Sequence, residues 1–315
     1  MKSQPPKRWL QASLAATPSN SNLFEEILYA LGAVSISLTD TLDQPILEPG
    51  VGETPLWQAI TLTALFVPPP TMDDSSAING LDANIRTKLK PFEEPCNLNI
   101  SWLEDKNWER ECLDQFEPIT FTNKLRVCPS WKYEPDNAYT DILLDPGLAF
   151  GTGTHATTYL CLEWLDTNTI QDKNVIDFGC GSGILGIAAL KLGAAQVTFV
   201  DNDPQAITAS EENLRRNNID SNNYRLICNR DGANEDKTKD DISNVDILIA
   251  NILAEPLIDL SDQITALLKP AGKLVLSGLL VGQSDLVSAA YRNSFKMNPI
   301  REREGWLCLT GSKKA

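Results

Sequence analysis

The pattern of apolar and polar positions along the first hundred residues predicts a small α/β unit. Strand-like stretches occupy residues 9–14, 33–38, 57–67 and 98–103, and helix-like stretches occupy residues 22–31 and 73–90. Gly32 directly follows the first of these helices, where a glycine commonly ends a helix. The predicted order is therefore β-α-β-β-α-β, which is typical of a ferredoxin-like α/β sandwich.

From residue 139 to the end, strands and helices alternate regularly, which predicts a parallel, doubly wound sheet. Strands are expected at residues 175–178, 197–200, 245–250 and 273–277, with helices at 157–165, 184–192, 204–217, 256–268 and 282–292. Asp203 followed by Pro204 is a favourable N-cap and N1 pair for the third of these helices. The last two segments, 300–303 and 306–309, are predicted to form a hairpin.

The stretch between the two halves has a weaker pattern. Residues 103–116 suggest a short helix, and Pro118, Pro129 and Pro135 interrupt the residues after it. Proline removes a backbone donor and restricts the residue before it, so this stretch favours a connection over a regular element. We therefore expect a ferredoxin-like α/β domain at 1–118, a linker at 119–138 and a Rossmann-like α/β domain at 139–315.

The most informative stretch of the sequence is residues 174–203, which combine a buried strand, a glycine turn, a helix and a second strand. Gly179, Gly181 and Gly183 allow the backbone to turn tightly and to lie against a ligand without Cβ interference. The second strand ends in Asp201, whose carboxylate can accept hydrogen bonds from both hydroxyls of a ribose. This arrangement predicts a site for a nucleotide-like cofactor.

Two cofactor families compete for this turn. Gly181, Gly183 and Gly186 spell G-x-G-x-x-G with Asp201 further on, as in a nicotinamide-dinucleotide site. However, Asp177 precedes the glycines, and its carboxylate would repel a pyrophosphate. A carboxylate suits a cofactor with an ammonium and a sulfonium group, which favours S-adenosylmethionine (SAM). The dinucleotide and a structural turn without a ligand remain the alternatives.

Charge and residue usage narrow the classes of function. The formal net charge is −15, with −8 over residues 1–136 and −7 over residues 137–315. No dense run of Lys and Arg appears outside the short end segments, which argues against direct binding to a nucleic-acid backbone. A basic protein partner fits this charge better, although acidity also serves solubility alone.

Cysteine and histidine usage points to a reducing compartment and to a site without metal. Seven cysteines occur without a C-x-x-C pair, which predicts neither a disulfide framework nor a zinc site, so we expect a cytoplasmic protein. His155 is the only histidine, which excludes multi-histidine metal sites. No apolar run reaches the length of a membrane span, and the first residues suggest a strand rather than a signal peptide. We expect a monomer.

Two further segments are predicted to meet the glycine turn at the carboxyl edge of the sheet. Asn251 ends the strand at 245–250, where its amide can orient an amine or the methionine end of the cofactor, or serve as a helix cap. The glycine- and threonine-rich loop at 144–158 can cover a cofactor. His155 in this loop is a candidate for proton removal, and a hydrogen bond that orders the loop is the favoured alternative. Cys180 suggests a nucleophile, but a small side chain tolerated in a tight turn is the favoured interpretation.

Three motifs together resemble the PrmA family, the methyltransferases of the large-subunit ribosomal protein numbered eleven. They are LDPGLAFGTGTHATT at 144–158, VIDFGCGSGILGIAALKLGA at 175–194 and ANILAEPL at 250–257, and the similarity covers essentially the whole chain. Ala156 stands where the family usually has proline, which affects the rigidity of the loop more than its chemistry.

The resemblance implies a C-terminal Rossmann-like class I SAM-dependent methyltransferase domain and an N-terminal ferredoxin-like domain that captures the ribosomal protein. It maps Thr158, Gly179, Asp201 and Asn251 to positions that contact the cofactor. The implied reaction methylates lysine ε-amines and the N-terminal α-amine, up to trimethylation. From the residues themselves, Asp177 and Gly181 join the predicted cofactor site, and Asn251 and His155 are the candidate catalytic residues.

Two rival functions stay open on the sequence. A SAM-dependent methyltransferase of an RNA base or a small amine is the first, but Asn251, Ile252 and Leu253 replace the N-P-P-Y type sequence that base methylation usually carries. A nicotinamide-dependent oxidoreductase is the second. The first differs from the main hypothesis in its substrate, and the second differs in its cofactor.

Overall fold

The computed structural model describes residues 8–42, 44, 54–69, 72–92, 97–104, 116–145, 153–229 and 244–315. The chain divides into two compact units, Met1–Glu111 and Cys112–Ala315. Residues 146–152 of the glycine- and threonine-rich loop and residues 105–115 of the predicted short helix lie outside the described residues.

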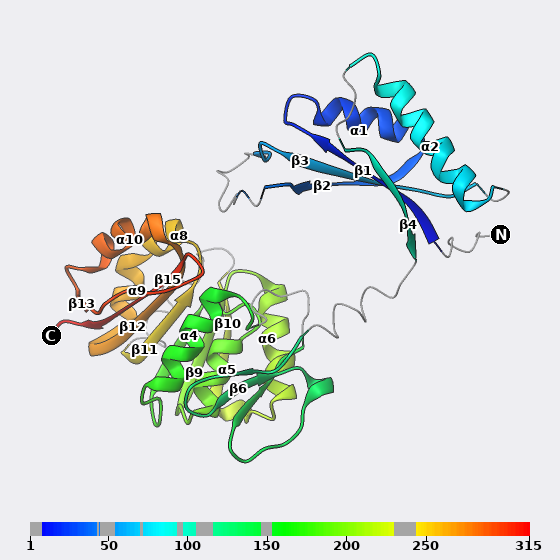
Figure 1. Cartoon of the computed structure of the whole chain (residues 1–315). Coiled ribbons are helices and arrows are strands. Elements are labelled where there is room, and N and C mark those ends of the chain that lie inside the picture. The colour runs from blue at the N-terminus through cyan, green and yellow to red at the C-terminus, as the bar shows by residue number, and fades with distance from the viewer. Residues whose placement is uncertain are drawn as a thin grey trace. The chain divides into compact units, whose positions relative to one another are not determined.

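The first unit has the predicted order β-α-β-β-α-β. Its elements are β1 (Arg8–Ala16), α1 (Ser21–Ala30), β2 (Ala33–Asp40), β3 (Ile60–Phe66), α2 (Asp74–Leu89) and β4 (Asn99–Glu104). The strands form one antiparallel sheet in the order β2-β3-β1-β4. Both helices lie on the same face of this sheet (Figure 1).

Strict alternation in the strands explains why only one face of this sheet is covered. In β1, Leu10, Ala12 and Leu14 are buried in the core beneath the helices, and Gln11 and Ser13 between them point to the other face. The second helix begins at the predicted place because the carboxylate of Asp73 accepts a hydrogen bond from the backbone N–H of Ser76 at 2.9 Å. The helix positions predicted from periodicity are therefore confirmed.

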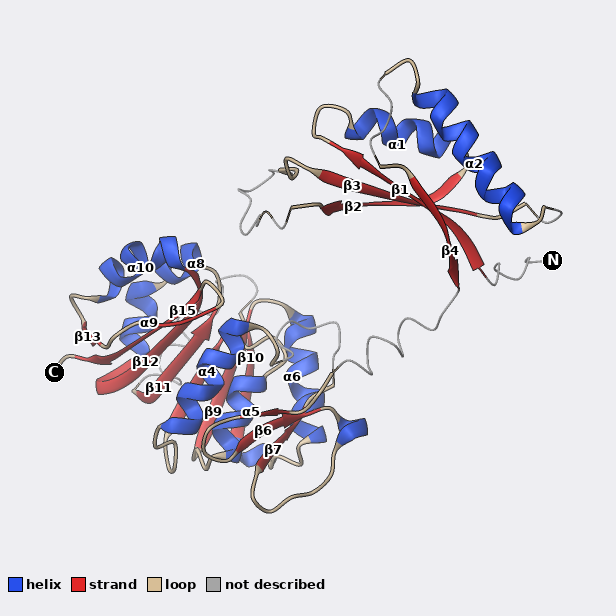
Figure 2. Cartoon of the chain, in the orientation of Figure 1, coloured by secondary structure: helices blue, strands red, loops and turns tan. Residues whose placement is uncertain are grey.

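The second unit is built on an eight-stranded sheet with the order β10-β9-β8-β11-β12-β15-β13, and β14 pairs with β15. Its strands are β8 (Asn174–Phe178), β9 (Gln196–Asp201), β10 (Tyr224–Cys228), β11 (Val245–Asn251), β12 (Leu268–Leu280), β13 (Phe295–Met297), β14 (Arg301–Arg303) and β15 (Trp306–Lys313). The helices are α4 (Ala156–Thr167), α5 (Ile184–Lys191), α6 (Pro204–Arg216), α8 (Ala254–Asp259), α9 (Ser261–Leu267) and α10 (Ser284–Tyr291). Figure 2 shows these helices packed around the strands.

The expectation of a parallel sheet up to the C-terminus was wrong. The strands from β10 to β12 are parallel, but β15 runs antiparallel to β12 and separates it from β13. The predicted hairpin is confirmed as β14 and β15. An apolar run predicts a buried strand but carries no information on its direction, so the insertion of β15 between two other strands was not visible in the pattern.

The segment expected to be a linker carries regular structure. Residues 119–138 contain β5 (Ile119–Thr120) and β6 (Leu125–Cys128), which join β7 (Thr140–Leu143) in a three-stranded sheet within the second unit. Leu125 is fully buried in the core of that unit. The buried carboxylate of Asp166 at the end of α4 accepts hydrogen bonds from the backbone N–H groups of residues 123–125. Pro118 and Pro129 therefore mark ends of short strands rather than a flexible connection.

The helix predicted at 256–268 is also divided. The structure has α8 and α9, separated at Leu260. Ser261 and Asp262 open the second helix, and an acidic residue in the first turn complements the helix dipole. The apolar pattern continues from α8 into α9, so the start of the second helix at Ser261 was not recognised in the sequence.

Candidate functional site

The glycine turn after β8 has the conformation that its sequence predicts. Gly179, Gly181 and Gly183 have φ angles of +73°, +53° and +78°, which other residues rarely adopt. The N–H of Gly179 donates to the carbonyl of Val200 at 2.8 Å, which fixes the turn beside the end of β9. The turn therefore presents bare backbone at the carboxyl edge of the sheet, where ligands of open α/β sheets bind.

Space around this turn is limited by the loop that follows β11. A Cβ atom on Gly179 would lie 2.3 Å from Cγ2 of Ile252, and a Cβ atom on Gly278 would lie 2.2 Å from the Ile252 carbonyl oxygen. Ile252 is therefore held between two glycines, which places the residue before it, Asn251, at the end of β11. No sequence pattern indicates this contact, because the partners are far apart in the chain.

Asp201 lies at the end of β9, next to the turn. One carboxylate oxygen accepts a hydrogen bond from the N–H of Gly181, and the other accepts one from the N–H of Asp203, both at 2.9 Å. Each carboxylate oxygen has two acceptor positions. Asp201 thus fixes the turn and keeps acceptor capacity for further donors.

Asp177 lies deeper than a ligand-contacting residue. Its side chain is only 1% exposed, and it accepts a hydrogen bond from the backbone N–H of Gly186 at 2.8 Å. Burial raises the pKa of Asp177 to about 7, with a smaller contribution from the charge of Asp201, while the bond from Gly186 opposes the shift. In this position the carboxylate holds the start of α5 beneath the glycine turn.

Asn251 and Thr158 are brought together from residues far apart in the sequence. The side-chain amide of Asn251 donates to the hydroxyl of Thr158 at 3.3 Å. Thr158 lies in the first turn of α4 and is fully buried. The cap of the following helix, α8, is Leu253, so Asn251 does not serve as its N-cap. The amide is thereby oriented at the same sheet edge as the glycine turn.

His155 is the N-cap of α4. Its Nδ1 accepts a hydrogen bond from the N–H of Thr157 at 3.4 Å and lies 2.8 Å from the hydroxyl of Thr157. The ring also packs edge-on against Trp306, with 4.9 Å between the centroids. As an acceptor, Nδ1 leaves the proton of the neutral ring on Nε2. These contacts hold the His155 ring at the start of α4.

Two polar residues of α6 support the turn and were not predicted. The hydroxyl of Ser210 donates to the carbonyl of Gly181 at 3.0 Å, and the amide of Asn213 donates to the carbonyl of Ser182 at 2.9 Å. Both side chains are buried. A sequence signal existed, because Ser210, Asn213 and Asn217 share one helix face at spacings of three and four residues.

Cys180 is a packed side chain of the turn. Its sulfur lies 3.4 Å from the hydroxyl of Ser210, and burial, together with the nearby charge of Asp177, raises the pKa of its thiol. A thiol that stays protonated is a poor nucleophile.

Within the described residues no group of His, Cys, Asp and Glu could hold a metal ion, and no helix there is long and apolar enough to cross a membrane.

Comparison with known proteins gives matches over nearly the whole chain. The model of the family described as "Ribosomal protein L11 methyltransferase (PrmA)" matches residues 8–314. A protein named ribosomal protein L11 methyltransferase from Marinobacter nauticus is 43% identical over 308 residues, which cover 97% of this chain and 99% of that protein. A protein of the same name from Pseudomonas syringae pv. tomato is 43% identical over 306 residues, with the same coverage of 97% and 99%.

A solved structure is similar as well. The ribosomal protein L11 methylase from Lactobacillus delbrueckii subsp. bulgaricus has a TM-score of 0.55 and 34% sequence identity. The match covers 64% of this chain and 100% of the other chain.

Proposed function

Because the chain belongs to the family of ribosomal protein L11 methyltransferases, we propose that it transfers methyl groups from SAM to amines of ribosomal protein L11. The observation that carries this proposal is the hydrogen bond between Asn251 and Thr158 at the carboxyl edge of the sheet. It places an oriented amide beside a glycine turn that ends next to the carboxylate of Asp201. The carboxylate can accept from the ribose of the cofactor while the amide faces the amine that receives the methyl group.

The residues present fit SAM. Gly179 and Gly181 adopt positive φ angles, which lets the turn present its backbone at the sheet edge. Asp201 can accept from the ribose hydroxyls with its remaining acceptor positions. Asn251 would contact the cofactor at the same sheet edge, and the fully buried Thr158 would act through the hydrogen bond that it accepts from Asn251. Asp177 supports this site from below, through its hydrogen bond with Gly186.

The chemistry supplied by bound SAM is an electrophilic methyl group on a sulfonium. The acceptor amine must be neutral to attack it, and at pH 7 deprotonating an ordinary lysine costs about 4.6 kcal/mol. We propose that Asn251 orients this amine through its carbonyl oxygen, while its N–H group is held by Thr158. Correct positioning supplies several kcal/mol in such reactions, so a strong base is not required. His155 orders the loop, and the lost proton passes to solvent.

We propose that the first unit is the ferredoxin-like domain that captures the substrate. Its antiparallel order β2-β3-β1-β4 supports this assignment. The sheet face opposite the helices carries a cross-strand row of small polar side chains, in which Ser37 pairs with Thr63, Thr63 with Ser13, and Ser13 with Asn99. Such a row offers donors and acceptors to a partner. The acidic charge of the chain suits a basic ribosomal protein.

We propose that lysine ε-amines and the N-terminal α-amine of L11 accept the methyl groups, with repeated transfer up to trimethylation. The reaction would take place in the cytoplasm. The test is incubation of the full chain with tritium-labelled SAM and unmethylated ribosomal protein L11, followed by mass spectrometry of the product. Methylated amines on L11 are expected. Transfer to free RNA or to small amines, with none to L11, would overturn the substrate assignment.

The cofactor is tested separately by calorimetric titration with SAM and with NAD. We expect saturable binding of SAM and none of NAD. Tight binding of NAD without binding of SAM would replace the methyltransferase with an oxidoreductase.

A further inference from the structure

A pocket lies where β8, β11 and β12 begin, at the edge of the large sheet opposite the glycine turn. Its volume is about 360 Å³. Lys173, Lys269 and Lys273 line it together with Asp246, and Trp164 and Pro270 contribute apolar surface. Since the glycine turn follows the carboxyl end of β8, this pocket is separate from the site described above.

The pocket is positively charged in a strongly acidic protein. Three lysines and one aspartate give its lining a formal charge of +2, whereas the whole chain carries −15. Lys269 forms an ion pair with Asp246, which also accepts a hydrogen bond from the backbone N–H of Asn174 at 3.0 Å. Burial opposes ionisation of Asp246, but these bonds and the charges of Lys269 and Lys173 outweigh it and lower the pKa. Asp246 is thus a fixed anion that neutralises one lysine.

The other two lysines keep free donors. Lys273 donates one hydrogen bond, to the hydroxyl of Ser312 at 2.8 Å. The side-chain ammonium group of Lys173 donates none to any residue within the part of the chain that the structure describes. An ammonium group has three donors, so two cationic groups face the pocket with most of their hydrogen-bonding capacity unused.

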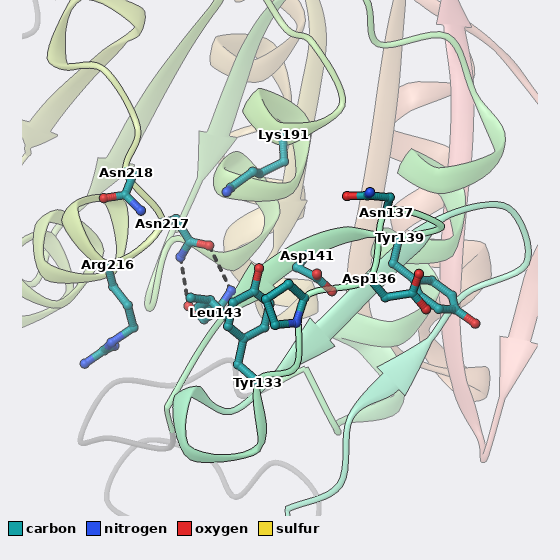
Figure 3. Close-up of a pocket in the computed structure, with 11 residues that line it drawn as sticks. Tyr133, Asp136, Asn137, Tyr139, Asp141, Leu143, Lys191, Arg216, Asn217 and Asn218 are labelled. Atoms are coloured by element: carbon teal, nitrogen blue, oxygen red, sulfur yellow. Dashed lines mark hydrogen bonds between the residues drawn. The ribbon is translucent and has the colours of Figure 1, made fainter.

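Another pocket of the second unit has a lining with a different formal charge (Figure 3). Its volume is about 330 Å³, and it is lined by Lys191 and Arg216 on one side and Asp136 and Asp141 on the other. These four groups give no net charge. Asn217 lies among them, with both polar atoms of its amide bonded to the backbone of Leu143 at 2.8 Å. This pocket therefore provides a lysine in a neutral setting for comparison.

We propose that the pocket of Lys173, Lys269 and Lys273 binds a small polyanion, a ligand with at least two phosphate or carboxylate groups. The net charge of +2 matches two negative charges, and the volume fits a small molecule. The apolar surface of Trp164 and Pro270 accommodates the part of the ligand between its charged groups. The pocket would add a ligand that the methyl-transfer site does not use.

The test is calorimetric titration of the full chain with inorganic pyrophosphate and, separately, with citrate at constant ionic strength. Saturable binding of one ligand per chain is expected for at least one of them, and the two arms distinguish a phosphate ligand from a carboxylate ligand. The dissociation constant should rise as sodium chloride is added, because salt screens these charges.

Two matched variants locate the site. Lys173→Met should weaken binding about fivefold or more, because it removes an ammonium group whose three donors are available to the ligand. Lys191→Met, which removes a lysine from the neutral pocket, should bind like the unmodified protein. Thermal melting provides a second readout, in which the same concentration of polyanion should raise the melting temperature of Lys191→Met more than that of Lys173→Met. Absence of binding to either ligand, or equal affinity in the two variants, would overturn the proposal.

Discussion

The side-chain amide of Asn251 donates a hydrogen bond to the hydroxyl of Thr158 at 3.3 Å, which joins the end of β11 to the first turn of α4. This bond uses one donor of the amide and leaves its carbonyl oxygen for an amine. Because Thr158 is fully buried, the orientation of Asn251 is fixed by a residue that itself cannot move into solvent.

Thr158→Val should therefore lower kcat through Asn251. The substitution keeps the shape of the side chain but removes the acceptor, and we expect kcat to fall by about tenfold, near the loss of one hydrogen bond. Asn251→Ala should cost more, because the amide itself is lost. The check is the rate of methyl transfer with saturating L11 and SAM; a Thr158→Val enzyme with unchanged kcat would show that the bond does not position Asn251.

Asp201→Ala should weaken SAM binding by about 2 kcal/mol or more through the loss of the ribose contacts. The variant also loses the acceptors for the N–H groups of Gly181 and Asp203, so its melting temperature should fall as well. Asp201→Asn is the matched control. It retains one carbonyl oxygen, so its affinity for SAM should lie between that of the unmodified protein and that of Asp201→Ala. Calorimetric titration with SAM measures the effect, and unchanged affinity in the alanine variant would place the ribose elsewhere.

Gly179→Ala should destabilise the turn by about 1 to 3 kcal/mol, because its φ angle is unfavourable for alanine and the new Cβ would collide with Ile252. Adding Ile252→Ala removes the colliding methyl group but not the backbone strain. The double variant should accordingly recover part of the lost stability. Thermal unfolding of both proteins checks this prediction, and a double variant no more stable than Gly179→Ala would contradict the collision.

Cys180→Ser should keep methyl transfer within about threefold of the unmodified rate, since a buried thiol with a raised pKa is not a nucleophile. The hydroxyl can retain the contact with Ser210. Complete loss of transfer, with an unchanged melting temperature, would instead indicate a chemical role for Cys180.

Asp177 should make folding stability depend on pH. Its pKa in the folded protein is raised to about 7 from the ordinary value of 3.8, so between these values the folded state binds more protons than the unfolded state. Stability from this group is therefore largest below about pH 4 and falls as the pH rises to about 7. Asp177→Asn should remove this part of the pH dependence. Urea unfolding of both proteins at pH 5 and pH 8 provides the measurement; parallel changes in the two would exclude this contribution from Asp177.

The sequence was sufficient to predict features that depend on neighbours in the chain. The glycine turn, the end of β9 at Asp201 and the cap of α6 at Asp203 were predicted because each depends on residues within a few positions. Asn251 was assigned to the same sheet edge because the carboxyl ends of parallel strands meet there.

Features that depend on distant partners were not predictable in this way. The support of Gly181 by Ser210 joins residues 29 positions apart, and the direction of β15 depends on its partner β12. The segment at 119–138 was taken for a linker because β5 and β6 are only two and four residues long. Strands this short are stabilised by the core that they join, and a local pattern does not contain that core.

The amide of Asn217 gives the small sheet a protected edge. One side of β7 pairs with β6, and on the other side Asn217 both donates to and accepts from the backbone of Leu143, as a neighbouring strand would. An exposed strand edge invites pairing with another protein molecule. By occupying these backbone groups, a single side chain makes them unavailable for pairing with another strand.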